Sequence, residues 1–142
     1  MDFWVSEMHT NNVKISIRAE RQLFSAQSEF QRLDIFETPE FGKVLTSNGN
    51  VIFTEKDEFI YDEMIVHVPM AVHPHVKNVL VLGGGDGGVP RELSYYDEIE
   101  HIDVVEADQL FVYACREHFP EDANGLDDDR VSMYYEDGLK FL

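Results

Sequence analysis

The chain has 142 residues, of which 44% are apolar, so it can bury a core and is not expected to be disordered. It carries 28 Asp and Glu against 11 Lys and Arg, a formal net charge of −17. Nucleic-acid binding depends on Lys and Arg that neutralise phosphates, so this balance argues against a nucleic-acid partner.

The acidic excess is larger in the second half of the chain. Residues 77–142 hold 16 acidic and 5 basic side chains, a net −11, whereas residues 1–76 hold 12 and 6, a net −6. A solvated acidic surface accounts for most of this charge. The more specific alternative is a cationic ligand.

The single cysteine and the lack of long apolar runs bear on the compartment. Cys115 has no partner cysteine, so no disulfide framework is predicted and a reducing compartment is expected. No run approaches the ~18 apolar residues needed to span a bilayer, and the N-terminus has no basic region followed by an apolar one. We expect a cytoplasmic protein that does not bind membranes.

The N-terminal third is typical of β-strands. Apolar and polar side chains alternate over residues 13–18, and again around Leu33 and Ile35, with the period of a strand that has one solvated face. Asn48 and Gly49 lie between two such runs, and both tolerate the positive φ of a tight hairpin. Residues 1–53 are therefore predicted to form a small β-domain that is one antiparallel meander.

A helix is predicted to follow from Thr54, because residues 54–57 fit a capping pattern ahead of an apolar helical period. Pro69 should bend or end it. Three histidines, His67, His73 and His75, suggest a metal site, but no Cys or carboxylate completes a recognisable ligand spacing. We predict ordinary packed or surface histidines and no metal.

A buried strand and a glycine-rich loop follow. Residues 78–82 form a continuous apolar run, typical of a strand buried on both faces of a parallel sheet. The next six residues satisfy G-x-G-x-x-G before a helical pattern, and Glu106 ends the next apolar strand, where an acidic residue binds ribose hydroxyls. The pattern predicts a nucleotide or nucleoside ligand. The glycines of this loop are Gly83, Gly84, Gly85, Gly87 and Gly88.

Asp86 inside this loop indicates the kind of ligand. A carboxylate at a helix N-terminus opposes a pyrophosphate but suits a sulfonium or ammonium group. It therefore favours a nucleoside sulfonium of the S-adenosylmethionine type over NAD, and an NAD-dependent oxidoreductase is disfavoured. The alternative is that Asp86 only caps the helix.

A second helix is predicted over residues 108–118 and a third strand over residues 131–135. Asp137 follows this strand, so it is expected at the carboxyl edge of the sheet beside Asp86 and Glu106, where open α/β sheets bind ligands. The predicted fold class is α/β.

These segments together resemble the spermidine synthases, the polyamine aminopropyltransferases, along the whole chain. The resemblance implies an N-terminal β-domain that mediates homo-oligomer contacts in a dimer or tetramer. It also implies that residues 54–142 are the first half of a Rossmann-like, S-adenosylmethionine methyltransferase-type sheet, truncated after its third strand. The matching segments are Trp4, Glu7, Ser28-Glu29-Phe30-Gln31, Phe36-Glu37-Thr38-Pro39-Glu40-Phe41-Gly42, Thr54-Glu55-Lys56-Asp57-Glu58-Phe59-Ile60-Tyr61, Glu63-Met64, Val79 to Val89, Arg91-Glu92, Glu106 and Asp137-Gly138.

The resemblance implies transfer of an aminopropyl group from decarboxylated S-adenosylmethionine, a co-substrate, to putrescine, giving spermidine and methylthioadenosine, with no cofactor. Gln31 and Glu106 would hold the ribose or nearby nucleoside atoms. Asp137 would contact the adenine amine, and Asp86 the cationic aminopropyl end. Tyr61 would line the amine site in a supporting catalytic role.

Two departures from the family pattern affect activity. Asp62 stands where relatives carry His or Gln, which makes the predicted amine pocket more acidic. The general base, needed because a primary ammonium has no lone pair, is in this family an aspartate after the fourth strand. That aspartate lies beyond Leu142, so the chain as given is expected to be inactive. The alternative function is a non-catalytic nucleoside-binding or assembly module.

Overall fold

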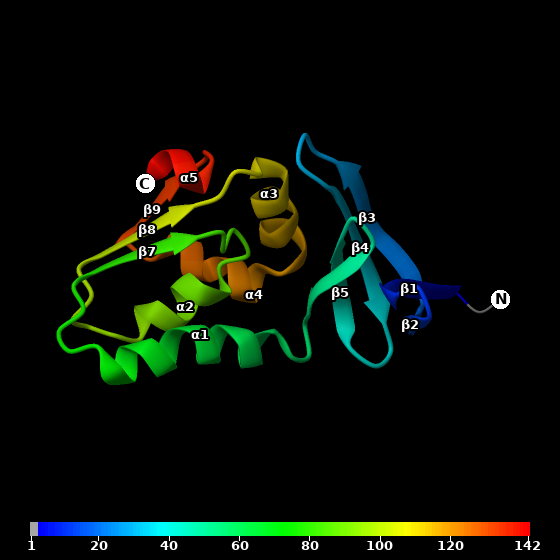
Figure 1. The fold of residues 1–142 in the computed structure, drawn as a ribbon, viewed down its shortest axis with the longest axis horizontal. Coiled ribbons are helices and arrows are strands. Elements are labelled where there is room, and N and C mark those ends of the chain that lie inside the picture. The colour runs from blue at the N-terminus through cyan, green and yellow to red at the C-terminus, as the bar shows by residue number, and fades with distance from the viewer. Residues whose placement is uncertain (1–2) are drawn as a thin grey trace. The chain divides into compact units, whose positions relative to one another are not determined.

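The computed structural model describes residues 3–142, so the first two residues of the predicted β-domain lie outside the described part (Figure 1). The chain divides into two compact units between Glu58 and Phe59. The first unit is antiparallel β and the second contains a parallel sheet with helices, which confirms the predicted α/β class. Of the helices in residues 3–142, none is long and apolar enough to cross a bilayer.

The first unit contains two sheets rather than one meander. Strands β1 (Phe3–Thr10) and β2 (Val13–Ala19) form a two-stranded hairpin. Strands β3 (Arg21–Gln27), β4 (Arg32–Thr38), β5 (Gly42–Ser47) and β6 (Asn50–Thr54) form a four-stranded antiparallel sheet in chain order. The sequence indicated the strands around residues 13–18, 33–35 and 42–45, but not β1 or β3 individually.

The hairpin between β5 and β6 forms as its residues predict. Asn48 and Gly49 have φ of 50° and 83°, the left-handed conformation that a two-residue turn between right-twisted strands requires. The turn sets the register Ser47 opposite Asn50. Inward-facing side chains of β4 and β5, including Leu33, Ile35 and Leu45, are fully buried and form the core of this unit.

The second unit begins with a helix that starts later than the sequence suggested. Thr54 is the last residue of β6, and helix α1 spans Glu58–Val72. The Thr54 hydroxyl donates to the Asp57 carboxylate at 2.5 Å, so the capping residues form the turn ahead of the helix. Pro69 lies inside α1 and does not end it, because the helix continues for three residues.

A three-stranded parallel sheet forms the centre of this unit, in the order β7-β8-β9. The strands are β7 (Asn78–Leu82), β8 (His101–Val105) and β9 (Val131–Tyr134). The helical segments between and after them are α2 (Gly88–Ser94), α3 (Gln109–His118), α4 (Pro120–Ala123), the 3-10 helix η1 (Asn124–Asp127) and α5 (Gly138–Phe141).

One face of the sheet packs against helices. Val66 of α1, Leu93 of α2 and Val112 of α3 form a core with Ile102 and Val104 of β8. Figure 1 shows α1 and α2 along this side. In strand β8, the middle strand of the sheet, Ile102, Val104 and Val105 are buried.

The prediction that residues 78–82 are buried on both faces is wrong for one face. Val79 and Val81 pack against the core, whereas Leu80 and Leu82 are 40% and 51% exposed. The apolar run reflects both faces of the strand, but only one of them meets helices that cover it in residues 3–142.

Helix α1 should become more stable when Pro69 is replaced. Pro69 lacks the backbone N–H of the helical ladder, and its side chain is exposed, so P69A would restore a hydrogen bond without opening a cavity. We expect the free energy of unfolding, measured by urea denaturation, to rise by about 1–2 kcal/mol. P74A, in the bend after the helix, is the control and should not stabilise. An unchanged or lower value for P69A would mean that α1 needs the proline.

Candidate functional site

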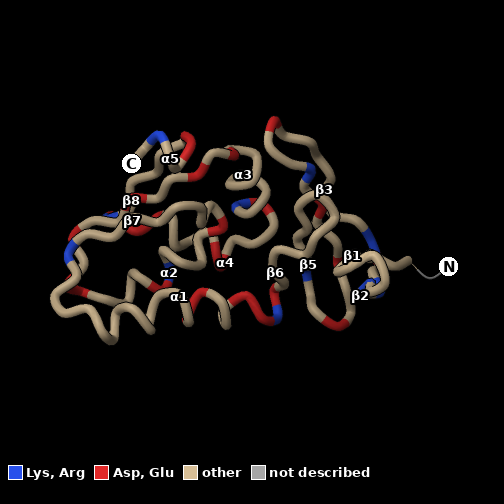
Figure 2. The backbone as a smooth tube through the Cα atoms, viewed as in Figure 1, with Lys and Arg blue, Asp and Glu red and all other residues tan. Residues whose placement is uncertain are grey.

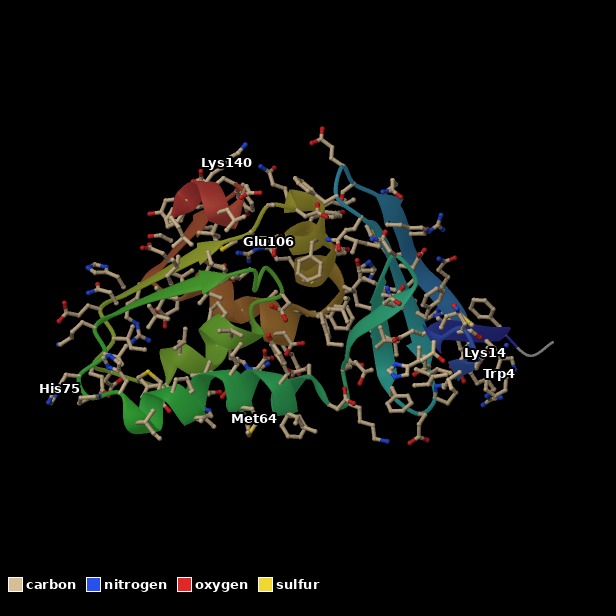
Figure 3. All side chains as sticks on the ribbon, in the orientation of Figure 1. Trp4, Lys14, Met64, His75, Glu106 and Lys140 are labelled. Atoms are coloured by element: carbon tan, nitrogen blue, oxygen red, sulfur yellow. The ribbon has the colours of Figure 1, made fainter. Side chains whose placement is uncertain are left out.

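The predicted ligand residues of the second unit follow the carboxyl ends of the parallel strands. The glycine loop follows β7, Glu106 follows β8, and Asp137 comes three residues after β9. Figure 3 shows Glu106 at the arrowhead end of β8. Because the three strands are parallel neighbours, these segments emerge at one edge of the sheet.

The glycine loop takes a conformation that only glycine adopts easily. Gly83, Gly84 and Gly87 have φ of 81°, 91° and 94°. The Gly83 N–H donates to the Val105 carbonyl at 2.9 Å, which ties the loop to the end of β8. Gly87 is the N-cap residue of α2, so Asp86 comes one position before the cap.

Glu106 lies directly against the loop. A Cβ at Gly85 would be 2.7 Å from Glu106 Cγ and 2.8 Å from Val112 Cγ2, so the close approach depends on the missing side chain. Glu106 Oε1 accepts from the Asp108 N–H at 3.1 Å. Asp108 in turn caps α3 by accepting from the Leu110 N–H at 3.1 Å. The carboxylate is therefore held in a fixed position between β8 and α3.

Burial raises the pKa of Glu106 above its ordinary value. The backbone N–H groups of Asp108 and Gly85 oppose this effect, and the negative charges of Asp108 and Asp86 add to it. Asp86 therefore lies near enough for its charge to act on Glu106. A cation or a hydroxyl donor placed between them would relieve the repulsion.

The negative charges near Glu106 also act on Cys115 of α3. Burial raises the pKa of its thiol strongly, and the charges of Asp86, Asp122 and Glu106 raise it further. The thiol is buried and unreactive, so it supplies no nucleophile. Figure 2 marks acidic residues in the segments that follow β8 and that lead into α5.

Asp137 is held by the backbone rather than by another side chain. Its Oδ1 accepts from the Leu139 N–H at 2.8 Å and the Lys140 N–H at 3.2 Å, so it caps α5 while staying exposed. One carboxylate oxygen is used in this cap.

Tyr61 and Asp62, neighbours in the sequence, lie in different environments on α1. Tyr61 is 67% exposed, whereas Asp62 is 2% exposed. A Cβ at Gly88 would overlap the Asp62 carboxylate, and Asp62 Oδ2 lies 3.8 Å from Arg91 Nη2. The structure thus places Asp62 inside the unit, against the start of α2. Its contact with a substrate amine stays a prediction.

Gln31 belongs to the first unit, in the turn before β4. Its N–H donates to the Ser28 hydroxyl at 3.0 Å, and its Oε1 accepts from the Ser47 hydroxyl at 2.6 Å. These bonds hold the side chain in a defined orientation within the first unit. Its role toward a nucleoside stays a prediction.

Sequence reasoning missed a set of charged residues behind the glycine loop. Arg91 of α2 pairs with Asp122 of α4, and its Nε lies 3.1 Å from Glu92 Oε1. His67 lies between Glu92 and Tyr96, with Nε2 2.9 Å from Glu92 Oε2 and Nδ1 2.7 Å from the Tyr96 hydroxyl. Arg91 and Glu92 belong to the segments that match the family pattern, but that pattern gave them no role.

The described residues offer carboxylates and backbone N–H groups rather than a metal centre. Within residues 3–142 no group of three or more His, Cys, Asp or Glu is placed to hold a metal ion. The edge of the sheet can accept hydrogen bonds from hydroxyls and can stabilise positive charge.

Two family models match the chain. The Spermine/spermidine synthase domain matches residues 58–142, and the Spermidine synthase tetramerisation domain matches residues 3–55. The chain is 63% identical over 142 residues to a polyamine aminopropyltransferase of Lachnospira eligens and 56% identical to one of Streptococcus pneumoniae. All of this chain is covered but only 50% of each relative, so the chain spans about half their length.

Solved structures agree. The structure of a spermidine synthase from Thermotoga maritima matches with a TM-score of 0.94 and 41% identity, covering 98% of this chain and 48% of that chain. A spermidine synthase in complex with the transition state analogue AdoDATO gives the same TM-score and identity, over 98% of this chain and 49% of that chain. These matches confirm the resemblance that the sequence motifs indicated.

Substituting Gly85 should disrupt the site. G85A adds a methyl group that must displace Glu106 and Val112, so we expect the free energy of unfolding to fall by about 1–3 kcal/mol. V112A is the matched second change, because it removes one of the two groups that the methyl meets. In the double variant the losses should be less than additive. Strict additivity would show that Val112 does not limit the space at Gly85.

Proposed function

Because the chain belongs to the spermine/spermidine synthase family, we propose that the chain binds the nucleoside of decarboxylated S-adenosylmethionine and methylthioadenosine. The binding would serve spermidine biosynthesis by aminopropyl transfer to putrescine. Decarboxylated S-adenosylmethionine is then a co-substrate, and the proposal includes no separate cofactor.

The observation that carries this proposal is the pair of acidic side chains beside the glycine loop. Glu106 is part-buried, and its pKa is raised by this burial and, to a smaller extent, by the charges of Asp108 and Asp86. Ribose hydroxyls are donors that a fixed carboxylate such as Glu106 accepts well. A sulfonium or ammonium group near Asp86 would offset the unfavourable concentration of negative charge.

The remaining contacts are proposed from the family pattern. Asp137 would accept a hydrogen bond from the adenine amine while its Oδ1 caps α5. Exposed Tyr61 would line the amine site as a supporting catalytic residue. Gln31, oriented by Ser28 and Ser47, would contact the nucleoside or ribose. Asp62 is buried and contacts the start of α2 instead.

The proposed reaction is a direct displacement. The putrescine nitrogen forms a bond to the carbon next to the sulfonium, the carbon–sulfur bond breaks, and its electron pair stays on sulfur as methylthioadenosine. The amine must first lose a proton, so a general base is required. We propose that this base is the aspartate that the family pattern assigns after a fourth strand, so the contacts above bind and orient without removing the proton.

We also propose a homo-oligomer, a dimer or tetramer, assembled through the first unit. The match of residues 3–55 to a tetramerisation domain supports this. So do the exposed apolar side chains of the β1 and β2 hairpin, with Trp4 and Met8 on one face and Ile15 on the other. Sedimentation equilibrium of the chain tests it.

Isothermal titration of methylthioadenosine tests the ligand site. Removing the charged acceptor in E106Q should weaken binding about tenfold or more, because hydrogen bonds to charged groups contribute about 1.5–3 kcal/mol. At pH 7 the unfolding midpoint of E106Q should equal or exceed that of the wild type, since the variant removes a buried charge. No heat of binding with well-folded wild-type protein would contradict the proposed site.

The pH dependence of binding follows from the raised pKa of Glu106. Hydroxyl donors favour the ionised carboxylate, so binding releases protons and weakens as pH falls through that pKa, which lies above the ordinary value of 4.5. E106Q should lose this pH dependence. A wild-type Kd that stays constant down to pH 4.5 would mean that Glu106 does not contact the ligand.

Residues 1–142 alone are expected to bind methylthioadenosine without making spermidine, because the proposed contacts include no general base. The measurement is chromatography of products after incubation with putrescine and decarboxylated S-adenosylmethionine. Binding without turnover is also what a nucleoside-binding module would give. Turnover at a normal rate would instead show that one of the described carboxylates acts as the base.

A further inference from the structure

We propose that Arg91 is the positioning residue of the glycine loop. Its guanidinium joins Asp62 of α1 to Asp122 of α4, and these two segments enclose the end of the loop at Gly87 and Gly88. The inference rests on the proposed function, because the loop is taken as part of the nucleoside site. Arg91 itself contacts no ligand in this proposal.

The guanidinium is central to a buried cluster of three carboxylates. Arg91 Nη1 donates to Asp122 Oδ1, Nε donates to Glu92 Oε1 at 3.1 Å, and Nη2 lies 3.8 Å from Asp62 Oδ2. The side chains of Asp62, Glu92 and Asp122 are 3%, 7% and 11% exposed. The planar fork of Arg reaches partners on three helices at once, which the single ammonium of Lys cannot do.

Asp62 and Asp122 both lie where the loop enters α2, Asp62 through its carboxylate and Asp122 through its backbone. A Cβ at Gly88 would overlap the Asp62 carboxylate, so this carboxylate is in direct contact with the first residue of the helix. On the other side, a Cβ at Gly87 would be 2.5 Å from the Asp122 carbonyl oxygen and 2.7 Å from Ala123 Cα. Any movement of Asp62 or Asp122 therefore changes the space available to the loop backbone.

Removing the guanidinium would leave three carboxylates close together in a buried region. Their repulsion and desolvation would drive protonation or movement apart. His67, 2.9 Å from Glu92, is the other basic group in the cluster, and it lies on the side of Glu92 toward Tyr96. It therefore cannot replace Arg91 between Asp62 and Asp122.

In this arrangement Asp62 does not bind the substrate amine directly. Its carboxylate contacts Gly88 and Arg91, whereas the neighbouring Tyr61 points outward. Asp62 thus acts on the ligand through the position of the loop. Its effect on binding should depend on Arg91.

The test compares R91K and R91Q with two arginine controls in the same chain. R130Q removes an arginine that donates to the carbonyls of Ser94, Tyr96 and Ile99 beyond the other end of α2, so it is a purely structural control. R116Q removes an exposed pair with Asp127. For each variant we would measure the unfolding midpoint, the Kd for methylthioadenosine, and amide hydrogen exchange of residues 83–88.

We expect both Arg91 variants to weaken methylthioadenosine binding about tenfold and to speed amide exchange at Gly87 and Gly88. R130Q should lower the unfolding midpoint but keep the wild-type Kd, and R116Q should change neither. R91K keeps the positive charge, so it carries the test if R91Q fails to fold. A wild-type Kd and wild-type exchange in R91K would overturn the proposal.

A double-mutant cycle tests the part of Asp62. D62N should weaken methylthioadenosine binding when it is made in the wild-type protein. Made in the R91K variant, it should have little further effect. Equal effects in both backgrounds would mean that Asp62 contacts the ligand directly. If the wild type does not bind methylthioadenosine, the proposed function fails, but amide exchange at Gly87 and Gly88 still decides whether Arg91 positions the loop.

Discussion

The second unit depends on the absence of a Cβ at two points of one loop. At Gly85 the missing side chain lets the stem of Glu106 lie against the backbone, and at Gly88 it lets the carboxylate of Asp62 do the same from another helix. The loop is therefore in contact with α1 on one side and with the end of β8 on the other. A larger residue at Gly85 or Gly88 would push these elements apart. The end of β8 and helix α1 can therefore pack against the loop only while both positions lack a side chain.

Close packing around the loop also brings negative charges together, and the fold balances them in two ways. Glu106 receives backbone N–H groups from Gly85 and Asp108, and yet burial keeps its pKa raised. Behind the loop, Arg91 provides a cation for three buried carboxylates. Glu106 stays part-exposed, whereas the carboxylates around Arg91 are enclosed. In the proposed function, this difference separates the ligand contact from the framework that holds it.

Periodicity predicted the elements wherever local chemistry decides them. The turn at Asn48 and Gly49, the helix near residues 108–118 and the strands near residues 78–82, 102–105 and 131–135 follow from residue types over a few positions. The start of α1 was misplaced because Thr54 pairs in β6, and a strand partner outweighs a capping pattern. Pro69 was overestimated as a break because it stands at an exposed position, three residues before the end of α1.

The sequence by itself determined the α/β class, the family and the acidic residues that follow the parallel strands, because these depend on residue order and spacing. Only the tertiary structure decided which carboxylates stay exposed and which are enclosed. Tyr61 and Asp62 are adjacent in the chain, yet one is exposed and the other buried, since a helix turns about 100° per residue. Arg91, Asp122 and Asp62 are far apart in the sequence, and their cluster exists only because three helices pack together around one guanidinium.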